Sequence, residues 1–316
     1  MKVMMIHHPH TCNKEDFPAL SIALGFFDGV HRGHQKVIGI AKEIAKTNGW
    51  KSAVMTFDPH PSVVLAKENT PIQYITPLQN KIDLIADLGV DYLFIVRFTS
   101  AFSNLTPEEF VEDYLAKLNI QHAVAGFDYS YGKYGKGTMD TLLVHADGKF
   151  EVTTVGKLEE KQEKISSTAI RKLLSEGSML EAKKLLGRFY ATRGTVIHGE
   201  KRGRTIGFPT ANIQLHNDYI IPKTGVYAVR ILVAGSWKDG VCNIGYKPTF
   251  KDPNKSDLSI EVHILDFDQS IYGEEIELKW HIRIRDEQKF NGIEELKTQI
   301  SKDKITTVNY FETIDK

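Results

Sequence analysis

Two histidines three residues apart, His31 and His34, stand in a glycine-rich stretch whose residue types could bind phosphate. The stretch reads GFFDGVHRGH from Gly25 to His34 and joins an apolar run to a segment whose apolar residues have helical spacing. This pattern predicts a strand, a tight turn and a helix. The first turn of a helix offers free N–H groups and the positive end of its dipole to an anion, and glycines let a ligand approach closely. The stretch therefore predicts a phosphate clamp; the alternative is an ordinary turn with surface or capping histidines.

Two further loops of the first half carry polar and aromatic groups after predicted strands. Asp58 and His60 lie in the segment TFDPHP, which follows a buried apolar run. In open α/β sheets, ligands bind at the carboxyl ends of parallel strands. Asp128 lies in the segment GFDYSYG, where it could hold a ribose hydroxyl or a metal ion while the tyrosines stack on a flat ring. Each loop could also be a plain turn.

The segment ISSTAIR, from Ile165 to Arg171, places hydroxyl groups and a guanidinium at another predicted helix start. Ser166 or Ser167 could cap free N–H groups, and capping alone would explain either serine. Arg171 lies one turn inside the helix, where its guanidinium could reach phosphates bound at the same end.

The second half has its own candidate phosphate site. A basic, glycine-rich loop over 198–204 is followed by the segment GFPTAN, in which Thr210 and Asn212 could offer oxygen ligands to a magnesium ion. Glu261 lies on one face of a predicted strand over 259–265, where a carboxylate could accept the proton of an attacking alcohol. The alternatives are a mobile basic hairpin and an outward-facing glutamate on a half-buried strand.

In the first half, the elements that position these residues follow an alternating pattern. Up to about residue 187, apolar runs typical of buried strands, such as 51–57 and 91–98, alternate with helical periods. The order βαβαβ predicts a parallel sheet covered on both faces. Two of the helices should begin with a capping Thr followed by Pro, at Thr76–Pro77 and Thr106–Pro107.

The pattern changes after a helix expected over 178–187, which has a capping box at its start and Gly187 at its end. From 191 to 285 apolar and polar residues alternate, with a hairpin turn at Ala234-Gly235-Ser236. Such strands predict a small antiparallel β-barrel, and a last helix is expected over 293–303. The predicted fold is thus an α/β, Rossmann-like domain with a parallel sheet over 1–186, then a barrel domain with a C-terminal helix over 187–316.

Composition limits the classes of function. The 316 residues are enough for two domains, and Lys plus Arg equals Asp plus Glu at 40 each, so no strongly basic nucleic-acid surface is expected. Cys12 and Cys242 lie far apart and outside any metal-binding spacing. No stretch has the length of a membrane span and no secretory signal begins the chain. We therefore expect a cytoplasmic protein without a nucleic-acid or membrane partner.

Five of these motifs carry a family resemblance. The form G-x-F-D-G-x-H-x-G-H resembles the HIGH-type signature of nucleotidyltransferases as found in FAD synthetases, and ISST-x-x-R resembles their second signature. GFPTAN resembles the riboflavin kinase signature. The TFDPHP segment also resembles a family motif, and GFDYSYG resembles G-x-D/N-F-x-F-G with both Phe replaced by Tyr. The chain thus resembles the prokaryotic bifunctional riboflavin kinase/FMN adenylyltransferases over nearly its whole length.

The resemblance implies a nucleotidyltransferase domain that converts FMN to FAD, a riboflavin kinase barrel, ATP as co-substrate and Mg²⁺. It implies catalytic roles for His31, His34, Arg171, Asn212 and Glu261, with Thr210 and Asn212 as metal ligands. The contacts that it implies to nucleotide, phosphate or flavin are Gly25, Phe27, Asp28, Gly33, Asp58, His60, Asp128, Ser166, Ser167, Thr168, Gly199, Arg202, Gly207, Pro209, Asn243 and Arg285.

Some questions stay open at the level of sequence. Which of Asp28, Asp58 and Asp128 meets a metal ion is not fixed, and the oligomeric state is open, a homo-oligomer included. The expected partners are the small molecules riboflavin, FMN and ATP. One alternative function is an adenylyltransferase whose barrel only binds flavin as a regulatory module. The other is a non-enzymatic nucleotide- or RNA-binding protein, which the balanced charge disfavours.

Overall fold

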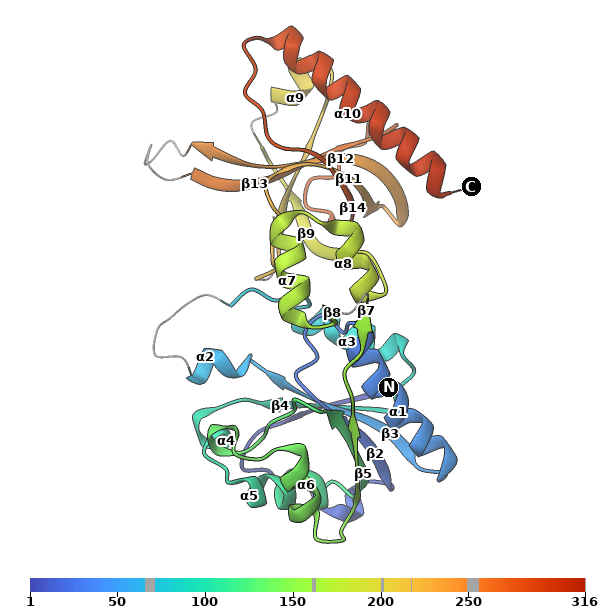
Figure 1. Cartoon of the computed structure of the whole chain (residues 1–316). Helices are drawn as coiled ribbons and strands as arrows, with labels where there is room; N and C mark the ends of the chain where they lie inside the picture. Colours follow the sequence, from blue (N-terminus) through green and yellow to red (C-terminus); the bar gives the residue numbers. More distant parts are fainter. Residues whose placement is uncertain (66–71, 161–162, 200–201, 217, 249–255, 316) are drawn as a thin grey trace. The chain divides into compact units, whose positions relative to one another are not determined.

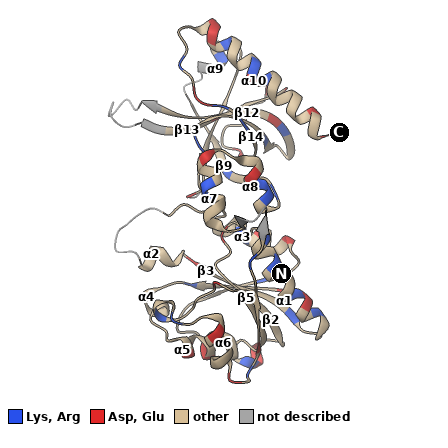
Figure 2. Ribbon diagram, viewed as in Figure 1, with Lys and Arg blue, Asp and Glu red and all other residues tan. Residues whose placement is uncertain are grey.

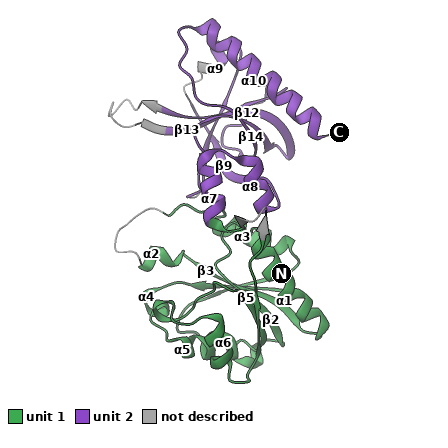
Figure 3. Cartoon of the chain, viewed as in Figure 1, with its two compact units in different colours: residues 1–167 green, residues 168–316 purple. Residues whose placement is uncertain are grey.

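The chain forms two compact units, Met1–Ser167 and Thr168–Lys316, which Figure 3 colours separately. Each unit has its own sheet and its own helices (Figure 1). The computed structural model describes residues 1–65, 72–160, 163–199, 202–216, 218–248 and 256–315.

The first unit is built on a six-stranded sheet with the order β1-β4-β3-β2-β5-β6 (Figure 1). Every neighbouring pair is parallel, which confirms the predicted sheet. The two edge strands, β1 and β6, are additions to the strands that the sequence predicts. The strands are β1 (Lys2–Ile6), β2 (Leu20–Leu24), β3 (Lys51–Asp58), β4 (Tyr92–Arg97), β5 (Ile120–Gly126) and β6 (Glu151–Val155).

The helices of this unit connect the parallel strands. They are α1 (Arg32–Thr47), α2 (Pro61–Leu65), α3 (Leu78–Asp87), α4 (Ser100–Ser103), α5 (Pro107–Val111) and α6 (Met139–Ala146). Short 3₁₀ turns lie at Lys14–Asp16 and Lys133–Gly135, a π-helical turn at Glu112–Ala116, and a two-stranded ribbon at β7 (Glu159–Glu160) and β8 (Glu163–Lys164). The capping box expected at Thr106 is present, with Glu109 as its partner. The cap expected at Thr76 is wrong: Pro77 occupies the N-cap position of α3 and makes no side-chain cap hydrogen bond, while the N–H of Thr76 is bound by Asp28.

The sheet separates two apolar clusters, as expected for a parallel sheet covered on both faces. Along β2, Ile22 and Leu24 belong to one cluster and Ala23 to the other. Along β3, Met55 and Val54 divide in the same way. Strand residues therefore alternate between the two cores, which fixes the strand register and with it the positions of the loops at the strand ends.

The order of the strands makes β2 the place where the chain reverses direction across the sheet. The chain runs from β2 through α1 to β3 on one side, and β5 pairs with β2 on the other side. Parallel sheets bind ligands in the crevice at the carboxyl ends of strands at such a switch point. The loops after β2, β3 and β5, which carry three of the predicted motifs of the first half, therefore lie at this edge.

The second unit is a closed six-stranded antiparallel barrel with the order β10-β13-β12-β11-β14-β9, as predicted. The hairpin expected at Ala234–Gly235 is present: both residues have positive φ, 48° and 74°, and Val233 pairs with Ser236. The strands are β9 (Tyr190–Ile197), β10 (Ala211–Leu215), β11 (Gly225–Val233), β12 (Ser236–Pro248), β13 (Ser256–Ile264) and β14 (Glu275–Arg285).

The helices of this unit are α7 (Ser167–Glu176), α8 (Met179–Leu186), α9 (Arg202–Thr205) and α10 (Ile293–Ile314). The last helix does not end at Asp303 as expected. It continues because Asp303, Thr307 and Phe311, four residues apart, are buried along one face. The helix α8 ends at Gly187, which is left-handed with φ 75°, as predicted; Ser178 stands at its N-cap without a side-chain cap hydrogen bond, so the expected capping box is absent.

Along the chain, the first compact unit ends at Ser167 and the second begins at Thr168, earlier than the expected boundary at 186/187. The reason is that α8 packs on β9 and β14 of the barrel. Figure 2 shows Lys and Arg interspersed with Asp and Glu along α1 and α10. Among the helices in the described residues, none is both long and apolar enough to cross a membrane.

Candidate active sites

The loop between β2 and α1 has an unusual backbone. Phe27, Gly29 and Val30 all have positive φ, at 56°, 89° and 38°. For Phe and Val this conformation costs about 1–3 kcal/mol each, and such residues cluster at functional sites. A side chain at Gly25 would place its Cβ 2.9 Å from the Phe27 ring, so the glycine makes room for this turn. Phe27 itself is 2% exposed and acts here as the apolar anchor of the loop.

Both predicted histidines lie at the start of α1. His31 is the N-cap residue, and its Nδ1 accepts the His34 N–H at 3.2 Å. The two rings stack with centroids 3.5 Å apart, and the Phe27 ring meets His34 edge-on at 5.2 Å. Since Nδ1 of His31 accepts, its neutral form carries the proton on Nε2 and can donate from there. The capping alternative is therefore right for His31. Its side chain is nevertheless buried, and the ring still carries a donor N–H at Nε2.

Asp28 supports the loop. Its carboxylate accepts the N–H groups of Ile75 and Thr76 at 3.2 and 2.9 Å, and the side chain is 2% exposed. A carboxylate that accepts backbone N–H groups in the interior holds two chain segments together. The structure thus places Asp28 between the β2–α1 loop and the segment before α3.

The loop after β3 lies beside the loop after β2. The His60 ring meets the Phe26 ring edge-on, with centroids 4.4 Å apart. Asp58 pairs with Arg97 at the end of β4, 2.6 Å from carboxylate oxygen to guanidinium nitrogen. The sheet therefore brings the TFDPHP motif to the GFFDGVHRGH motif, as the strand order requires.

The loop after β5 turns tightly at Asp128, which is exposed. Tyr131 does not face a ligand: it is 5% exposed, and its hydroxyl hydrogen-bonds Nδ1 of His145 at 2.8 Å. His145 in turn lies 3.2 Å from the carboxylate of Glu108. Burial raises the pKa of Tyr129, whose ring lies parallel to that of Tyr131. Of the tyrosines that replace the family's phenylalanines, Tyr131 is thus a core residue and Tyr129, partly buried, packs against the core.

The second nucleotidyltransferase signature begins at this edge. The Ser167 hydroxyl donates to the Asp28 carbonyl at 2.9 Å, and a Cβ at Gly33 would lie 3.7 Å from the Ile165 carbonyl. Ser166 is half-buried next to them. Thr168 and Arg171 follow in α7 and belong to the second unit.

On the barrel, predicted site residues line up across the strands. Asn212 of β10 pairs with Glu261 of β13, and Glu261 pairs with Asn243 of β12. The row continues through Val226 of β11 to Arg285 of β14. Residues directly opposite one another in a sheet point to the same face. The register therefore places the three polar side chains side by side on one face of the barrel.

The Thr210 hydroxyl donates to a carboxylate oxygen of Glu261 at 3.3 Å. The turn before Thr210 is held by His263, whose Nδ1 hydrogen-bonds the Pro209 carbonyl at 2.8 Å. Gly199 lies against the Asn212 side chain so closely that any Cβ there would clash with it. The PTAN turn and Glu261 thus form one compact polar group.

A cavity of about 360 Å³ opens on one side of this group. Its polar lining includes Thr210, Asn243, Glu261, Arg285 and Glu287. Its apolar lining is made by Ile206, Phe208, Val226, Val241, Phe290, Leu296 and Ile300. Mostly apolar walls with a few convergent polar groups are typical of a site for a flat organic ligand.

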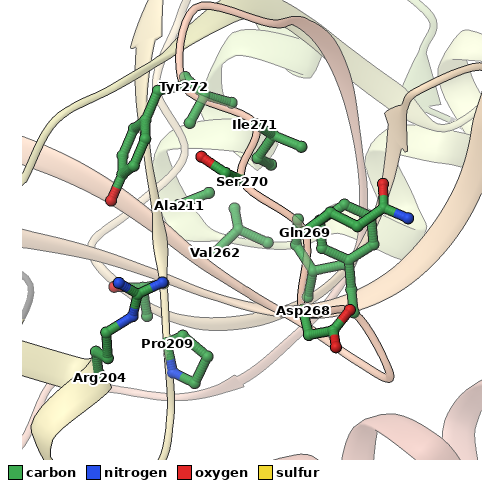
Figure 4. A pocket seen from close by; sticks show the side chains of 13 residues that line it. Arg204, Pro209, Ala211, Val262, Asp268, Gln269, Ser270, Ile271 and Tyr272 are labelled. Carbon is green, nitrogen blue, oxygen red and sulfur yellow. The ribbon is translucent and has the colours of Figure 1, made fainter.

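A second cavity, of about 260 Å³, lies on the other side of the PTAN turn. Figure 4 shows Arg204 and Pro209 at one side of it and Asp268 and Gln269 at another. Thr210 lines both cavities. Thr210, which donates its hydroxyl hydrogen bond to Glu261, therefore forms part of the wall of each cavity.

Some predicted residues have other surroundings than expected. Arg285 forms a forked ion pair with Asp303 of α10, with nitrogen–oxygen distances of 3.0, 3.0 and 2.8 Å, so its guanidinium ties the last strand to the last helix. Gly207 is left-handed with φ 90°. Arg202 begins α9, and Glu200 and Lys201 of the same basic loop lie outside the described residues.

Sequence reasoning missed two supporting residues, Asp303 and Lys81. Lys81 is 2% exposed in α3, and its ammonium donates to the Phe26 carbonyl at 2.8 Å and to the Thr56 hydroxyl at 3.3 Å. A signal existed for Lys81: it stands among Leu78, Ile82 and Ile85 at the spacing of the buried face. Asp303 gave no local signal, since its partner lies 18 residues away in another element.

The described residues contain no cluster of three or more His, Cys, Asp and Glu side chains that could hold a metal ion. Magnesium, however, prefers oxygen ligands and is usually held by one or two protein groups together with substrate phosphates. The Thr210 hydroxyl, the Asn212 amide and the Glu261 carboxylate are oxygen donors of this kind, close together on the barrel. These residues therefore fit a magnesium ion that arrives with a nucleotide.

Comparison with known proteins agrees with this division into two sites. The family model for FAD synthetase matches residues 13–169, and the model for riboflavin kinase matches residues 186–311. Proteins named bifunctional riboflavin kinase/FMN adenylyltransferase are similar over the whole chain. One from Bacillus subtilis (strain 168) is 54% identical, covering 100% of both chains. One from Escherichia coli (strain K12) is 36% identical, covering 97% of both.

A solved structure has the same overall fold. It is described as a macrolide-efflux protein from Streptococcus pneumoniae, is 35% identical and matches with a TM-score of 0.87. The match covers 98% of this chain and 99% of that one. The arrangement of a parallel-sheet unit followed by a barrel unit therefore recurs in an experimental structure.

Proposed function

This chain belongs to the family of bifunctional riboflavin kinases/FMN adenylyltransferases, and from this premise we propose which residues carry each of its two activities. The enzyme phosphorylates riboflavin to FMN and adenylylates FMN to FAD, with ATP as co-substrate of both reactions. We assign the kinase reaction to the barrel and the adenylyl transfer to the edge of the parallel sheet.

In the kinase reaction, Glu261 is the general base. The flavin ring occupies the larger, apolar cavity, and the ATP phosphates enter from the cavity beside Arg204. Glu261 takes the proton of the ribityl 5′-hydroxyl, and the oxygen attacks the γ-phosphorus of ATP. The bond from the γ-phosphorus to the bridging oxygen breaks, and ADP leaves. Asn243 and Asn212, on either side of Glu261 in the sheet, orient the reacting groups.

Thr210 and Asn212 would hold the magnesium ion that accompanies ATP, together with the phosphates. When bound, this ion neutralises charge on the β- and γ-phosphates. The Gly207–Pro209 turn and the basic loop that contains Gly199 and Arg202 position the phosphate chain. The tight packing of Gly199 against Asn212 supports this arrangement.

In the adenylyl transfer, the start of α1 binds the ATP phosphates. A phosphate oxygen of FMN attacks the α-phosphorus, the bond between the α- and β-phosphates breaks, and pyrophosphate leaves. His31 and His34 donate to the charge that develops there. Gly25, Gly33, Ser166 and Ser167 shape the phosphate cradle. For Thr168 and Arg171 the sequence signature alone predicts contacts with the β- and γ-phosphates. No covalent enzyme intermediate is needed, so catalysis rests on positioning and charge.

We further assign Asp58, His60 and Asp128 to the flavin and nucleotide side of the same edge, and Phe27 and Asp28 to its support. The aromatic pair of Phe26 and His60, which meet edge-on at the end of β2 and β3, supports a flavin site there. Arg285 supports the kinase site by holding α10 through Asp303. It thereby fixes the wall formed by Phe290, Leu296 and Ile300.

One observation carries the kinase assignment: Thr210, hydrogen-bonded to Glu261, lines both barrel cavities. A barrel that only bound flavin would need neither a second cavity nor a base at the junction. The test incubates the full chain with riboflavin, ATP and Mg²⁺ and separates the flavins over time. FMN followed by FAD supports the assignment. FAD formed only from supplied FMN would make the barrel a binding module, and no flavin product would refute both activities.

A further inference from the structure

Lys81 is a charged residue at a core position of the first unit. It stands in α3 between Leu78 and Ile85, on the helix face that packs against the sheet. Only 2% of it is exposed. A buried ammonium is costly unless its donors and its charge are satisfied, and an apolar residue of the same size would be easier to accommodate. The position therefore calls for an explanation other than packing.

One acceptor of Lys81 lies in the loop that carries the phosphate motif, and the other lies near the end of β3. Nζ donates to the carbonyl of Phe26 at 2.8 Å and to the Thr56 hydroxyl at 3.3 Å. It also lies over the Phe26 ring, 3.9 Å from the centroid, which stabilises a cation. The Thr56 hydroxyl donates to the same carbonyl at 2.8 Å. Lys81 thus ties α3 to the end of β3 and to the peptide that precedes Phe27.

The residues after this peptide have the strained backbone described above. Phe27 and Val30 keep positive φ only while their surroundings hold them. Asp28 is fixed from one side by the segment before α3. The carbonyl of Phe26 is fixed from the other side by Lys81. Both supports come from the chain at α3, and between them they set the path that leads to His31.

We propose that Lys81 is a positioning residue for adenylyl transfer: its protonated amine holds the Phe26 carbonyl and thereby the turn that aims His31 and His34 at the nucleotide. The inference rests on the proposed function of the first unit. It adds that this site depends on a buried positive charge contributed from outside the sequence motif. The barrel reaction should not depend on it.

The charge state of Lys81 makes the proposal testable by pH. Burial lowers the pKa of Lys81 from 10.5 to about 8, against the charges of Asp28 and Asp58, which raise it. The other titratable groups facing it are His60 and Tyr74, across the Phe26 ring. As pH rises above 8, the amine loses its charge and its attraction to the Phe26 ring and carbonyl. Adenylyl transfer should therefore decline over this interval.

Stability should change in the opposite direction. The unfolded chain keeps the Lys81 proton up to pH 10.5, whereas the folded chain releases it near pH 8. The unfolded state therefore binds more protons between these values, and this group makes folding more favourable as pH rises. A role in stability alone thus predicts no loss of function above pH 8. A positioning role for the cation predicts loss of one activity without unfolding.

The experiment compares the wild type, Lys81→Met and the exposed-site control Lys46→Met. Adenylylation of supplied FMN, phosphorylation of riboflavin and the melting temperature are each measured from pH 7 to pH 10. At pH 7 we expect Lys81→Met to lose about tenfold or more in adenylylation kcat. Its kinase activity should be unchanged. We also expect a melting temperature at pH 7 no lower than that of the wild type. In the wild type, the adenylylation rate divided by the kinase rate should fall as pH rises above 8. In Lys81→Met this ratio should not change with pH.

The outcomes separate the two levels of inference. A wild type that makes no FAD from FMN would refute the proposed function itself. A wild type that makes FAD, with Lys81→Met equally active or with the same pH profile, would overturn the role of Lys81 alone. A variant that loses both activities together with its melting temperature would make Lys81 a structural residue and would also overturn the proposal. Lys81→Arg keeps its charge above pH 8. Whatever adenylylation activity this variant has at pH 7 should therefore persist at high pH.

Discussion

The phosphate cradle of the first unit is made of loops, whereas the site of the second unit is made of strands. In the first unit, three successive turns meet at the carboxyl edge of the sheet, and the key turn contains Phe27 and Val30 in a left-handed conformation. In the barrel, Asn212, Glu261 and Asn243 are neighbours because strand register makes them so. Side chains placed by strand register need few contacts from other parts of the chain to hold their positions. A strained loop keeps its conformation only with several such contacts.

This difference appears in what surrounds each site. The loop is held by two buried charged groups: Asp28, which belongs to the motif, and Lys81, which comes from α3 outside it. The barrel row is held by ladder hydrogen bonds, and its main outside support is the ion pair of Arg285 with Asp303. In the barrel, substitutions of Asn212, Glu261 or Asn243 should therefore lower the kinase rate. Substitutions in the Arg285–Asp303 ion pair should lower the stability of the barrel. Around the loop the two effects should be harder to separate.

The largest effect expected is that of Glu261→Gln. Removing a general base costs about 10²- to 10⁴-fold in rate, and an amide cannot take the proton of the ribityl hydroxyl. We expect kinase activity to fall by this factor while FAD formation from supplied FMN is unchanged. The measurement is the separate assay of both reactions on one preparation. Equal loss of both would contradict independent sites and remove the basis of the comparison.

The next effect is that of His34→Ala on the loop-built site. Loss of one preorganised donor costs about 100-fold or more in turnover, and the variant also loses the ring that stacks on His31 at 3.5 Å. Adenylylation should fall by that factor with kinase activity intact. His7→Ala, at an exposed histidine of the same unit, is the control. Normal adenylylation in His34→Ala would mean that the imidazole is only part of the helix start.

Much of this could be predicted from the sequence because the signals were local. The order of strands and helices, the barrel and its Ala234–Gly235 hairpin follow from periodicity and turn residues, and the structure confirms them. The strand register then explains why Asn212 and Glu261, far apart in the chain, are neighbours. Their roles stay predictions until the assays are done.

What the sequence did not reveal depends on partners that are distant in the chain. The edge strand β1 is only five residues long and is followed by a polar segment, so its pattern was weak. The expected cap at Thr76 is absent: Pro77 takes the N-cap position, and the Thr76 backbone is instead bound to Asp28 in a tertiary contact. Arg285 fits the family motif, yet only the fold reveals that its guanidinium forms an ion pair with Asp303. Local patterns locate motifs; support residues are known only once the chain has folded.

A third prediction concerns that support. Asp303 is 3% exposed and Arg285 is 16% exposed. Leaving a buried charge unpaired costs about 3–5 kcal/mol, and the partial exposure of Arg285 favours the lower end. Asp303→Asn should therefore destabilise the barrel by about 3 kcal/mol and weaken flavin binding, since α10 forms part of the cavity wall.

The measurement is urea unfolding followed by tryptophan fluorescence in a Trp50→Phe background, which leaves Trp237 and Trp280 of the barrel as reporters. Glu312→Gln, at an exposed position of the same helix, should unfold like the parent. If Asp303→Asn unfolds like the parent too, the barrel is held by its ladder alone. The contrast with the loop-built site would then be sharper than we propose.

The smallest effect is the pH dependence of barrel stability through His281. This side chain is 2% exposed and stacks on Phe189 with centroids 3.7 Å apart. Burial, with the positive charge of Arg230 next in weight, lowers the pKa of His281 from 6.5 to about 3. The other charged groups facing it are Lys183, Lys279 and Asp315.

Above pH 6.5 His281 is neutral in both the folded and the unfolded chain, so its contribution to stability is constant. Below pH 6.5 the unfolded chain takes up the proton and the folded chain does not, so stability is lost as pH falls towards 3. The loss is at most about 1.4 kcal/mol per pH unit. Unfolding curves at pH 7 and pH 5 in the same Trp50→Phe background measure it. His281→Phe should flatten this dependence. An unchanged slope in the variant would mean that other groups govern the acid sensitivity of the barrel.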